Sequence, residues 1–461
     1  MNIIEASRAL RSKKVSSVEL TTQALDAISR LGSKLNSFLT VTGDLAKDQA
    51  RQADAELAQG IDRGPLHGIP IAIKDVYETQ GIRTTCGSKL FENYVPERDA
   101  AVVERLRGAG AVSVGKTHMH ELAYGVTSNN PHFGPVHNPW DLDRIPGGSS
   151  GGSGAAVAAG IVFMATGSDT GGSIRMPAAY CGTVGLKPTF GRVSRYGVLP
   201  LDFSLDHMGP LTCTVRDAAI VLNTLAGYDP RDDSSSREPV RDYLPKERVE
   251  IVGVRIGIPE NFYLERADAE VIAAVRAAAQ TAAYLGARLV PVKVPDIAAL
   301  NTVGRVILLV EASACMERYL DRRSDFGADV LALLDQGRLV AAPDYVNAQR
   351  MRRVLRDEFQ ALFQTIDCMF TPTLPIAAPK IGQATIEICG QEEDVRLAST
   401  KFVRGINVLG WPALSLPCGF TTSGLPIGLQ IIGKPFEEDL ILRVGAAIED
   451  ATEHHKRRPV L

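Results

Sequence analysis

The sequence lacks the features that mark nucleic-acid-binding, membrane-spanning and metal-binding proteins. Its 50 lysines and arginines are balanced by 53 aspartates and glutamates, for a formal net charge of −3. A basic surface for nucleic acid or anionic lipid is therefore not expected. No run of 18 apolar residues occurs, which argues against a membrane-spanning helix. No H-E-x-x-H or similar spacing suggests a metal site, and none of the eight histidines is assigned a role.

Cysteine is also scarce. The seven cysteines are odd in number and lie far apart, with no C-x-x-C pair. This pattern favours reduced thiols over a disulfide framework. The first 20 residues contain no uninterrupted apolar stretch of the kind found in secretory signals. We therefore expect a soluble protein of the cytoplasm.

The apolar pattern alternates between helix and strand. Ser16 to Glu19 has the S-x-x-E form of a capping box and precedes apolar residues at helical spacing. The short apolar runs at 68–75 (GIPIAIKD) and 111–116 (AVSVGK) indicate buried strands. The alternation continues over 155–168, 252–286 and 412–433. Such alternation predicts an α/β layered fold.

Two further segments bear on the domain organisation. Residues 229–242 form the most polar stretch and are expected to be an exposed loop within one fold. Residues 300–360 have a helical pattern and could cover the active-site face of the core. We expect residues 1–461 to form a single domain.

Lys74 ends the apolar run at 68–75 and has two interpretations. A lysine at the end of a strand can extend to the surface, with its alkyl chain against apolar neighbours. If the side chain is buried instead, burial disfavours the charged form and lowers the pKa. A neutral amine could then act as a base.

The glycine- and serine-rich stretch PGGSSGGSG, at 146–154, could be a linker, a phosphate loop or part of a hydrolase site. An apolar helical segment follows directly, which argues against a linker. A Walker loop needs G-x-x-x-x-G-K-[ST], and no lysine follows these glycines. Residues 147–151 match the G-x-S-x-G pattern of α/β-hydrolases, but that pattern is loose.

DTGGSIR, at 169–175, carries a serine after two glycines. The glycines let backbone N–H groups turn toward one point, as in an oxyanion hole, and leave Ser173 placed as a nucleophile. The alternative is a tight turn between a strand and a helix, with a capping serine.

Taken together, these segments resemble the amidase signature family of serine hydrolases. The match includes Lys74, GGSSGGS (147–153), DTGGSIR (169–175) and PAAYCGTVGLKPTFGR (177–192), and it extends to residues 425–442. The resemblance implies a single α/β/α sandwich with a large mixed, twisted β-sheet covered by helices. It also implies hydrolysis through an acyl-enzyme, without a metal or an organic cofactor.

The resemblance also implies a Ser-cisSer-Lys triad. Ser173 corresponds to the nucleophile and Lys74 to the base. The bridging serine of the family lies 24 residues before the nucleophile, which selects Ser149 over Ser150. The Gly148–Ser149 peptide bond is then expected to be cis.

Further roles follow from the same resemblance. The backbone N–H groups of Thr170, Gly171 and Gly172 would form the oxyanion hole. Asp169 and Arg175 flank this loop and would brace it. Substrate contacts are expected from Tyr124 and Gly125, which lie in a loop at 121–134, and from Arg352.

We interpret the sequence as a stand-alone amidase. The expected substrate is a small aryl or alkyl amide, a carbamate (urethane) or a urea. The only partner expected is this small molecule, with no nucleic acid and no membrane, and a homodimer is compatible with the sequence.

Two alternatives stay open. One is the glutaminase A subunit of a tRNA-dependent amidotransferase, which works beside partner subunits. Against it, SNNPHF (128–133) stands where that subunit typically has T-E-N-S-A-F, and Thr400 stands where it has an acidic residue for the glutamine amino group. Arg352 aligns with an arginine that binds the substrate carboxylate there. The other alternative is a non-catalytic binding or scaffold protein on the same fold.

Overall fold

The computed structural model describes residues 1–461 and is built on one mixed β-sheet of eleven strands. The strand order is β1-β3-β2-β6-β8-β7-β14-β15-β11-β9-β10. These strands are β1 (Phe38–Val41), β2 (Pro70–Lys74), β3 (Val112–Thr117), β6 (Met164–Asp169), β7 (Val184–Lys187), β8 (His207–Thr212), β9 (Arg255–Pro259), β10 (Arg288–Val292), β11 (Cys368–Pro372), β14 (Ala413–Phe420) and β15 (Pro426–Gly433). Two small hairpins pair β4 (Asn129–Asn130) with β5 (Gly134–Pro135) and β12 (Thr385–Ile388) with β13 (Gln391–Asp394).

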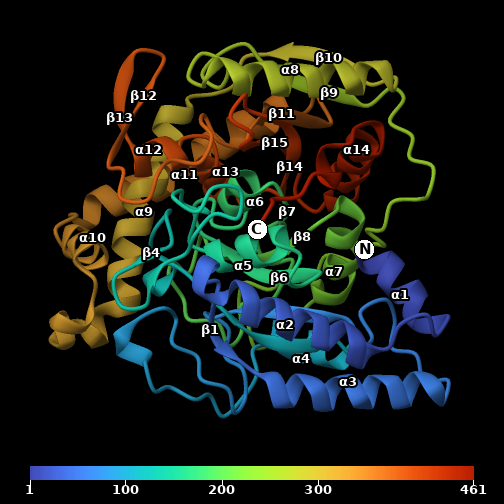
Figure 1. The fold of residues 1–461 in the computed structure, drawn as a ribbon. Helices are drawn as coiled ribbons and strands as arrows, with labels where there is room; N and C mark the ends of the chain where they lie inside the picture. The colour runs from blue at the N-terminus through green and yellow to red at the C-terminus, as the bar shows by residue number, and fades with distance from the viewer.

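Fourteen α-helices surround this sheet. They are α1 (Ile3–Arg11), α2 (Ser17–Leu35), α3 (Gly43–Ala58), α4 (Ala101–Gly108), α5 (Gly151–Ala158), α6 (Arg175–Cys181), α7 (Val215–Leu225), α8 (Ala269–Tyr284), α9 (Ile297–Met316), α10 (Ala328–Arg338), α11 (Ala342–Leu362), α12 (Val395–Thr400), α13 (Arg404–Leu409) and α14 (Glu438–Ala451). Helices α2 and α3 lie at one end of the molecule, and α8 lies at the other with β9 and β10 (Figure 1). Short 3-10 helices occur at Lys89–Phe91, Glu121–Ala123, Glu317–Asp325 and His454–Lys456.

The expected fold class is confirmed. The sheet is mixed because β2 pairs in parallel with β3 and β6, whereas β6, β8, β7, β14, β15 and β11 pair antiparallel in succession. One hydrophobic cluster of 89 buried residues includes both Ile3 of α1 and Ile448 of α14. The first and last helices therefore pack on the same core.

Local signals placed several elements correctly. The capping box at Ser16 is present, with Ser16 accepting from the Glu19 N–H and Glu19 accepting from the Ser16 N–H, and α2 begins directly after it. The run at 68–75 contains β2, and the run at 111–116 covers all of β3 except its last residue, Thr117. The polar stretch at 229–242 lies between α7 and β9 and contains no helix or strand.

The predicted helical segment at 300–360 is confirmed as α9, α10 and α11. By length and composition, α9 with its following 3-10 helix could cross a membrane, but half of its most apolar stretch is buried in the fold. It packs against α10, α11 and α13. Helix α9 is therefore a core helix of this fold.

Candidate active site

Two neighbouring parallel strands position the lysine of the site. β2 ends at Lys74 and β6 ends at Asp169, and the two strands pair at Ile71–Met164 and Ala72–Ala165. Because the carboxyl ends of parallel strands lie at the same edge of a sheet, both segments open onto one region. The backbone N–H of Lys74 donates to Thr166 Oγ1 at 2.8 Å, which fixes the end of β2 against β6.

Lys74 is fully buried and contacts two serines. Its Nζ donates to Ser149 Oγ at 2.8 Å and to Ser168 Oγ at 2.8 Å. Burial lowers the pKa of Lys74 to about 7, although the carboxylates of Asp206 and Asp169 act in the opposite direction. Roughly half of the amine is then neutral near pH 7. The surface interpretation of this lysine is wrong, because no part of its side chain reaches solvent.

The glycine-rich stretch at 146–154 is buried throughout and forms a tight turn into α5. The Gly148–Ser149 peptide bond is cis, as the resemblance implies. A side chain on Gly148 would place its Cβ 2.8 Å from the backbone of Val126, and one on Gly152 would lie 2.4 Å from the His118 carbonyl oxygen. The glycines therefore let neighbouring backbone pack directly against the segment that carries Ser149. A linker is excluded.

Ser173 lies in the turn between β6 and α6, and only 5% of its surface is exposed. The backbone N–H of Ser150 donates to the Ser173 carbonyl oxygen at 3.3 Å, which joins the two serine-bearing segments. Gly172 has a φ of +122°. Ser149 and Ser173 make no direct hydrogen bond through their hydroxyls in this structure.

The oxyanion prediction needs one correction. The Gly172 N–H donates to Asp169 Oδ1 at 2.7 Å, so it is not available to an oxyanion. The N–H groups of Thr170, Gly171 and Ser173 have no hydrogen-bond partner within the protein. The candidate oxyanion donors are therefore the N–H groups of Thr170, Gly171 and Ser173, and not that of Gly172.

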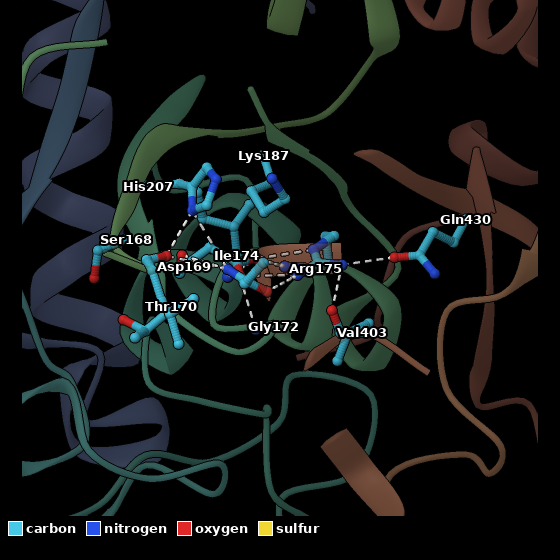
Figure 2. A network of polar contacts seen from close by, with 12 residues as sticks. Ser168, Asp169, Thr170, Gly172, Ile174, Arg175, Lys187, His207, Val403 and Gln430 are labelled. Carbon is cyan, nitrogen blue, oxygen red and sulfur yellow. Dashed lines mark hydrogen bonds and ion pairs between the residues drawn. The ribbon is translucent and has the colours of Figure 1, made fainter. Parts of the chain in front are cut away.

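Asp169 and Arg175 form a buried ion pair that braces the turn. Two guanidinium nitrogens of Arg175 donate to the Asp169 carboxylate, at 2.9 and 3.0 Å. Burial by itself raises the pKa of Asp169, but the charge and hydrogen bonds of Arg175 outweigh it and hold that pKa well below its usual value. Arg175 also donates to the Val403 carbonyl and to Gln430 Oε1, at 3.0 and 2.7 Å (Figure 2).

Several residues of this network were not foreseen. Thr166 and Ser168 lie two positions apart on β6, and both contact Lys74. Two polar residues at this spacing in a buried strand share one face of the sheet. That pattern could have indicated a polar contact with a neighbouring strand. Asn407 and Gln430 reach the site from more than 200 residues further along the chain. Nothing near them in the sequence indicated this contact.

A pocket of about 290 Å³ opens onto Ser173. Tyr124 and Gly125 line it, as does Thr400. The other lining residues are Ala123, Val126, Thr170, Gly171, Met176, Leu201, Arg305, Leu308, Leu309, Asp394, Arg396, Leu397 and Arg404. Helix α9 supplies three of these residues, so part of the 300–360 segment lines this pocket.

Arg352 lies outside this pocket. Its Nε donates to the Val408 carbonyl at 2.7 Å and its Nη2 to the Ser204 carbonyl at 3.0 Å. The guanidinium therefore joins α11 to neighbouring backbone and is not on the helix surface. The arginines that line the pocket are Arg305, Arg396 and Arg404, which no motif in the sequence indicated.

The geometry can be compared with known proteins. Residues 19–442 match a protein-family model described as Amidase. The chain belongs to the amidase family. The family acts on carbon–nitrogen bonds, and its members carry this fold.

Three individual proteins are similar to this chain over nearly its whole length. The A subunit of the glutamyl-tRNA(Gln) amidotransferase of Carboxydothermus hydrogenoformans is 41% identical, over 99% of this chain and 98% of that protein. A solved inhibitor-bound complex, described as a vestigial protein complex that reveals the origins of an s-triazine catabolic enzyme, has a TM-score of 0.94 at 38% identity, over 98% of each chain. The A subunit of the Thermotoga maritima glutamyl-tRNA(Gln) amidotransferase has a TM-score of 0.80 at 36% identity, over 98% of this chain and 94% of that one.

These relatives overturn two expectations. The interpretation as a stand-alone amidase of small amides, carbamates or ureas is wrong, because curated proteins similar over nearly the whole chain are amidotransferase A subunits. The expectation that a small molecule is the only partner is wrong as well, because those relatives are named as subunits and another similar chain was solved in a protein complex. Local departures such as Thr400 do not outweigh similarity that extends along the whole chain.

Proposed function

We propose that this chain is the glutaminase A subunit of a tRNA-dependent amidotransferase. It hydrolyses the side-chain amide of glutamine and passes the ammonia to partner subunits, as one catalytic domain in the cytoplasm. The observation that supports this most strongly is the 41% identity to a curated A subunit over 99% of this chain. The buried contact of Lys74 with Ser149, near Ser173, is consistent with amide hydrolysis.

The proposed mechanism begins with Lys74 in its neutral form. Lys74 accepts a proton from Ser149, and Ser149 takes the proton of Ser173 as the Ser173 oxygen attacks the carboxamide carbon. The tetrahedral oxyanion would be met by N–H groups of Thr170, Gly171 and Ser173, at roughly 3 kcal/mol of stabilisation per donor.

Collapse of this intermediate breaks the carbon–nitrogen bond. Ser149 returns a proton to the leaving nitrogen, which departs as ammonia and leaves a γ-glutamyl ester on Ser173. Water then attacks the ester carbon and gives its proton to Ser149, which passes its own proton to neutral Lys74. As the carbon–oxygen bond to Ser173 breaks, Ser149 gives a proton to the Ser173 oxygen and regains one from Lys74. The products are glutamate and ammonia, and the enzyme returns to its starting state.

The pocket also offers a carboxylate that the Thr400 position lacks. Asp394 lies six positions before Thr400, and both line the pocket. The difference at Thr400 therefore does not remove all negative charge from the site.

The proposal is tested by measuring ammonia and glutamate release from glutamine. The purified chain is assayed alone and after co-expression with the amidotransferase's other subunits, and Ser173→Ala serves as the blank. We expect equal amounts of the two products, and their loss in Ser173→Ala. Absence of glutamine hydrolysis both with and without the other subunits would overturn the proposal.

A further inference from the structure

Three arginines line the pocket beside Ser173 and have no acceptor in the protein. Arg305 comes from α9, Arg396 from α12 and Arg404 from α13, and none of them donates a hydrogen bond or forms an ion pair. By contrast, the buried Arg175 pairs with Asp169, and the half-exposed Arg255 pairs with Asp367. Arg404 is buried, Arg396 is partly buried and Arg305 is exposed. Buried guanidinium groups are normally paired, so the isolation of Arg404 needs an explanation.

Burial and neighbouring positive charge both make the charged form of Arg404 less favourable. Burial lowers the pKa of Arg404 to about 10, and the nearby charges of Arg396 and Arg305 contribute to that decrease. Burial also lowers the pKa of Arg396. One wall of the pocket thus concentrates positive charge around the buried Arg404, and a bound anion would relieve both the repulsion among the three arginines and the lost hydration of Arg404.

The pocket has one carboxylate to set against three guanidinium groups. That carboxylate, Asp394, caps α12 and accepts the Leu397 N–H at 2.9 Å. Its charge is therefore partly engaged with the helix terminus. The single negative charge of Asp394 does not balance the three guanidinium groups, so the pocket keeps an excess of positive charge.

The arginines are also close to the reacting centre. A Cβ built on Gly171 would lie 3.7 Å from Arg404 Nε, which places this guanidinium beside the oxyanion turn. The Arg404 Nε and the Tyr124 hydroxyl are both buried without a partner, and both residues line the pocket. Hydrogen-bond donors without acceptors thus surround the space next to Ser173.

We propose that Arg305, Arg396 and Arg404 form a receptor for a carboxylate on the amide substrate, and that the site selects its substrate by this anion and not by an ammonium group. The reaction assigned to the pocket rests on the proposed function. The substrate class is an amide whose other end carries a carboxylate. Glutamine meets this requirement through its α-carboxylate, while its α-ammonium faces a pocket of net positive charge.

Three amides that share the same carboxamide end separate the contributions of the carboxylate and the ammonium group. Glutaramate is glutamine without its amino group, and 4-aminobutanamide is glutamine without its carboxylate. For the complete enzyme, we expect kcat/KM for glutaramate to equal or exceed that for glutamine. We expect 4-aminobutanamide to be at least about 100-fold poorer than glutamine, since it offers the guanidinium groups no charged acceptor.

Arginine variants test the receptor directly. Arg404→Gln and Arg396→Gln should each lower kcat/KM for glutaramate by about 10- to 100-fold. Neither should lower the residual rate on 4-aminobutanamide to a similar degree. Arg353 is an exposed arginine of α11 outside this pocket. Arg353→Gln is therefore the matched control and should leave kcat/KM unchanged for glutamine, glutaramate and 4-aminobutanamide. Arg396 is less buried than Arg404, so its variant serves if Arg404→Gln does not fold.

Binding to the inactive Ser173→Ala protein separates this inference from the proposed function. Calorimetric titration with glutaramate should give an affinity that falls at least about tenfold when Arg404→Gln or Arg396→Gln is added. If no amide is hydrolysed under any condition but this arginine-dependent binding persists, the proposed function fails and the receptor stands. If glutamine is hydrolysed but 4-aminobutanamide reacts as well, or the arginine variants bind glutaramate unchanged, the receptor is overturned.

Discussion

Asn407 donates from its side-chain amide to both the backbone carbonyl and the carboxylate of Asp169, at 2.7 and 2.8 Å. Asp169 in turn accepts from Arg175 and from the backbone N–H of Gly172. The Asp169 carboxylate thus holds the turn that carries Ser173, and Asn407 of α13 holds that carboxylate in place. The same helix begins at Arg404, which lines the pocket. Helix α13 therefore couples the position of Ser173, the proposed nucleophile, to the wall of the adjacent pocket.

The buried Asp169–Arg175 pair should contribute strongly to stability. Arg175→Met leaves the Asp169 carboxylate in the interior without its counter-charge, which typically costs about 3–5 kcal/mol. Urea denaturation should show this loss in the free energy of unfolding, together with a fall in activity as the turn loses its brace. Arg323→Met, which breaks an exposed pair with Asp335, is the control and should leave stability nearly unchanged. Equal stability of the two variants would contradict the bracing role.

Neighbouring serines should differ sharply in their importance. Ser149→Ala removes the hydroxyl that contacts Lys74, whereas Ser150→Ala removes one that donates to the Ser168 carbonyl at 3.3 Å. We expect Ser149→Ala, like Ser173→Ala and Lys74→Ala, to lower kcat by at least about 1,000-fold. Ser150→Ala should keep most of the activity. Thermal unfolding of each protein checks that the fold is retained, and a larger loss in Ser150→Ala than in Ser149→Ala would reverse the assignment.

The rate should rise with pH as Lys74 loses its proton. Burial places the pKa of Lys74 at about 7, and only the neutral amine can accept a proton from Ser149. At pH values below this pKa, the charged form dominates and kcat/KM should fall about tenfold per pH unit. Above it, the rate should reach a plateau. Steady-state rates from about pH 5.5 to 9 give the profile, and a flat profile would exclude Lys74 as the base.

Much of this site could be predicted from the sequence because its chemistry lies at the ends of elements with clear local patterns. Lys74 closes an apolar strand, and Ser149 and Ser173 lie in glycine-rich turns that precede helices. The prediction that these three residues act together came from the resemblance of their short segments to one family. The strand and helix positions came from periodicity alone.

The rest of the site depends on contacts between distant parts of the chain. Asn407 and the pocket arginines lie on helices whose sequence gives no sign of what they face. Arg352 was singled out by alignment, but packing directs its guanidinium to backbone carbonyls. The Gly172 N–H was expected to face the oxyanion, but the fold of the turn directs it to Asp169. Only the three-dimensional structure decides which donors remain free.

Gly172 should tolerate no side chain. Its φ of +122° lies in a region that residues with a Cβ rarely adopt, and a Cβ there would lie 2.4 Å from Val403 Cγ2. Gly172→Ala should therefore displace either the turn or α13, with loss of most activity and a destabilisation larger than backbone conformation alone would cause. Gly60→Ala is the matched control, because Gly60 also has a positive φ, of +80°, but nothing lies within 4 Å of its Cβ position. That variant should cost only about 1–2 kcal/mol and keep full activity. Urea denaturation and glutamine hydrolysis measure both effects, and similar losses in the two variants would show that the contact with Val403 does not matter.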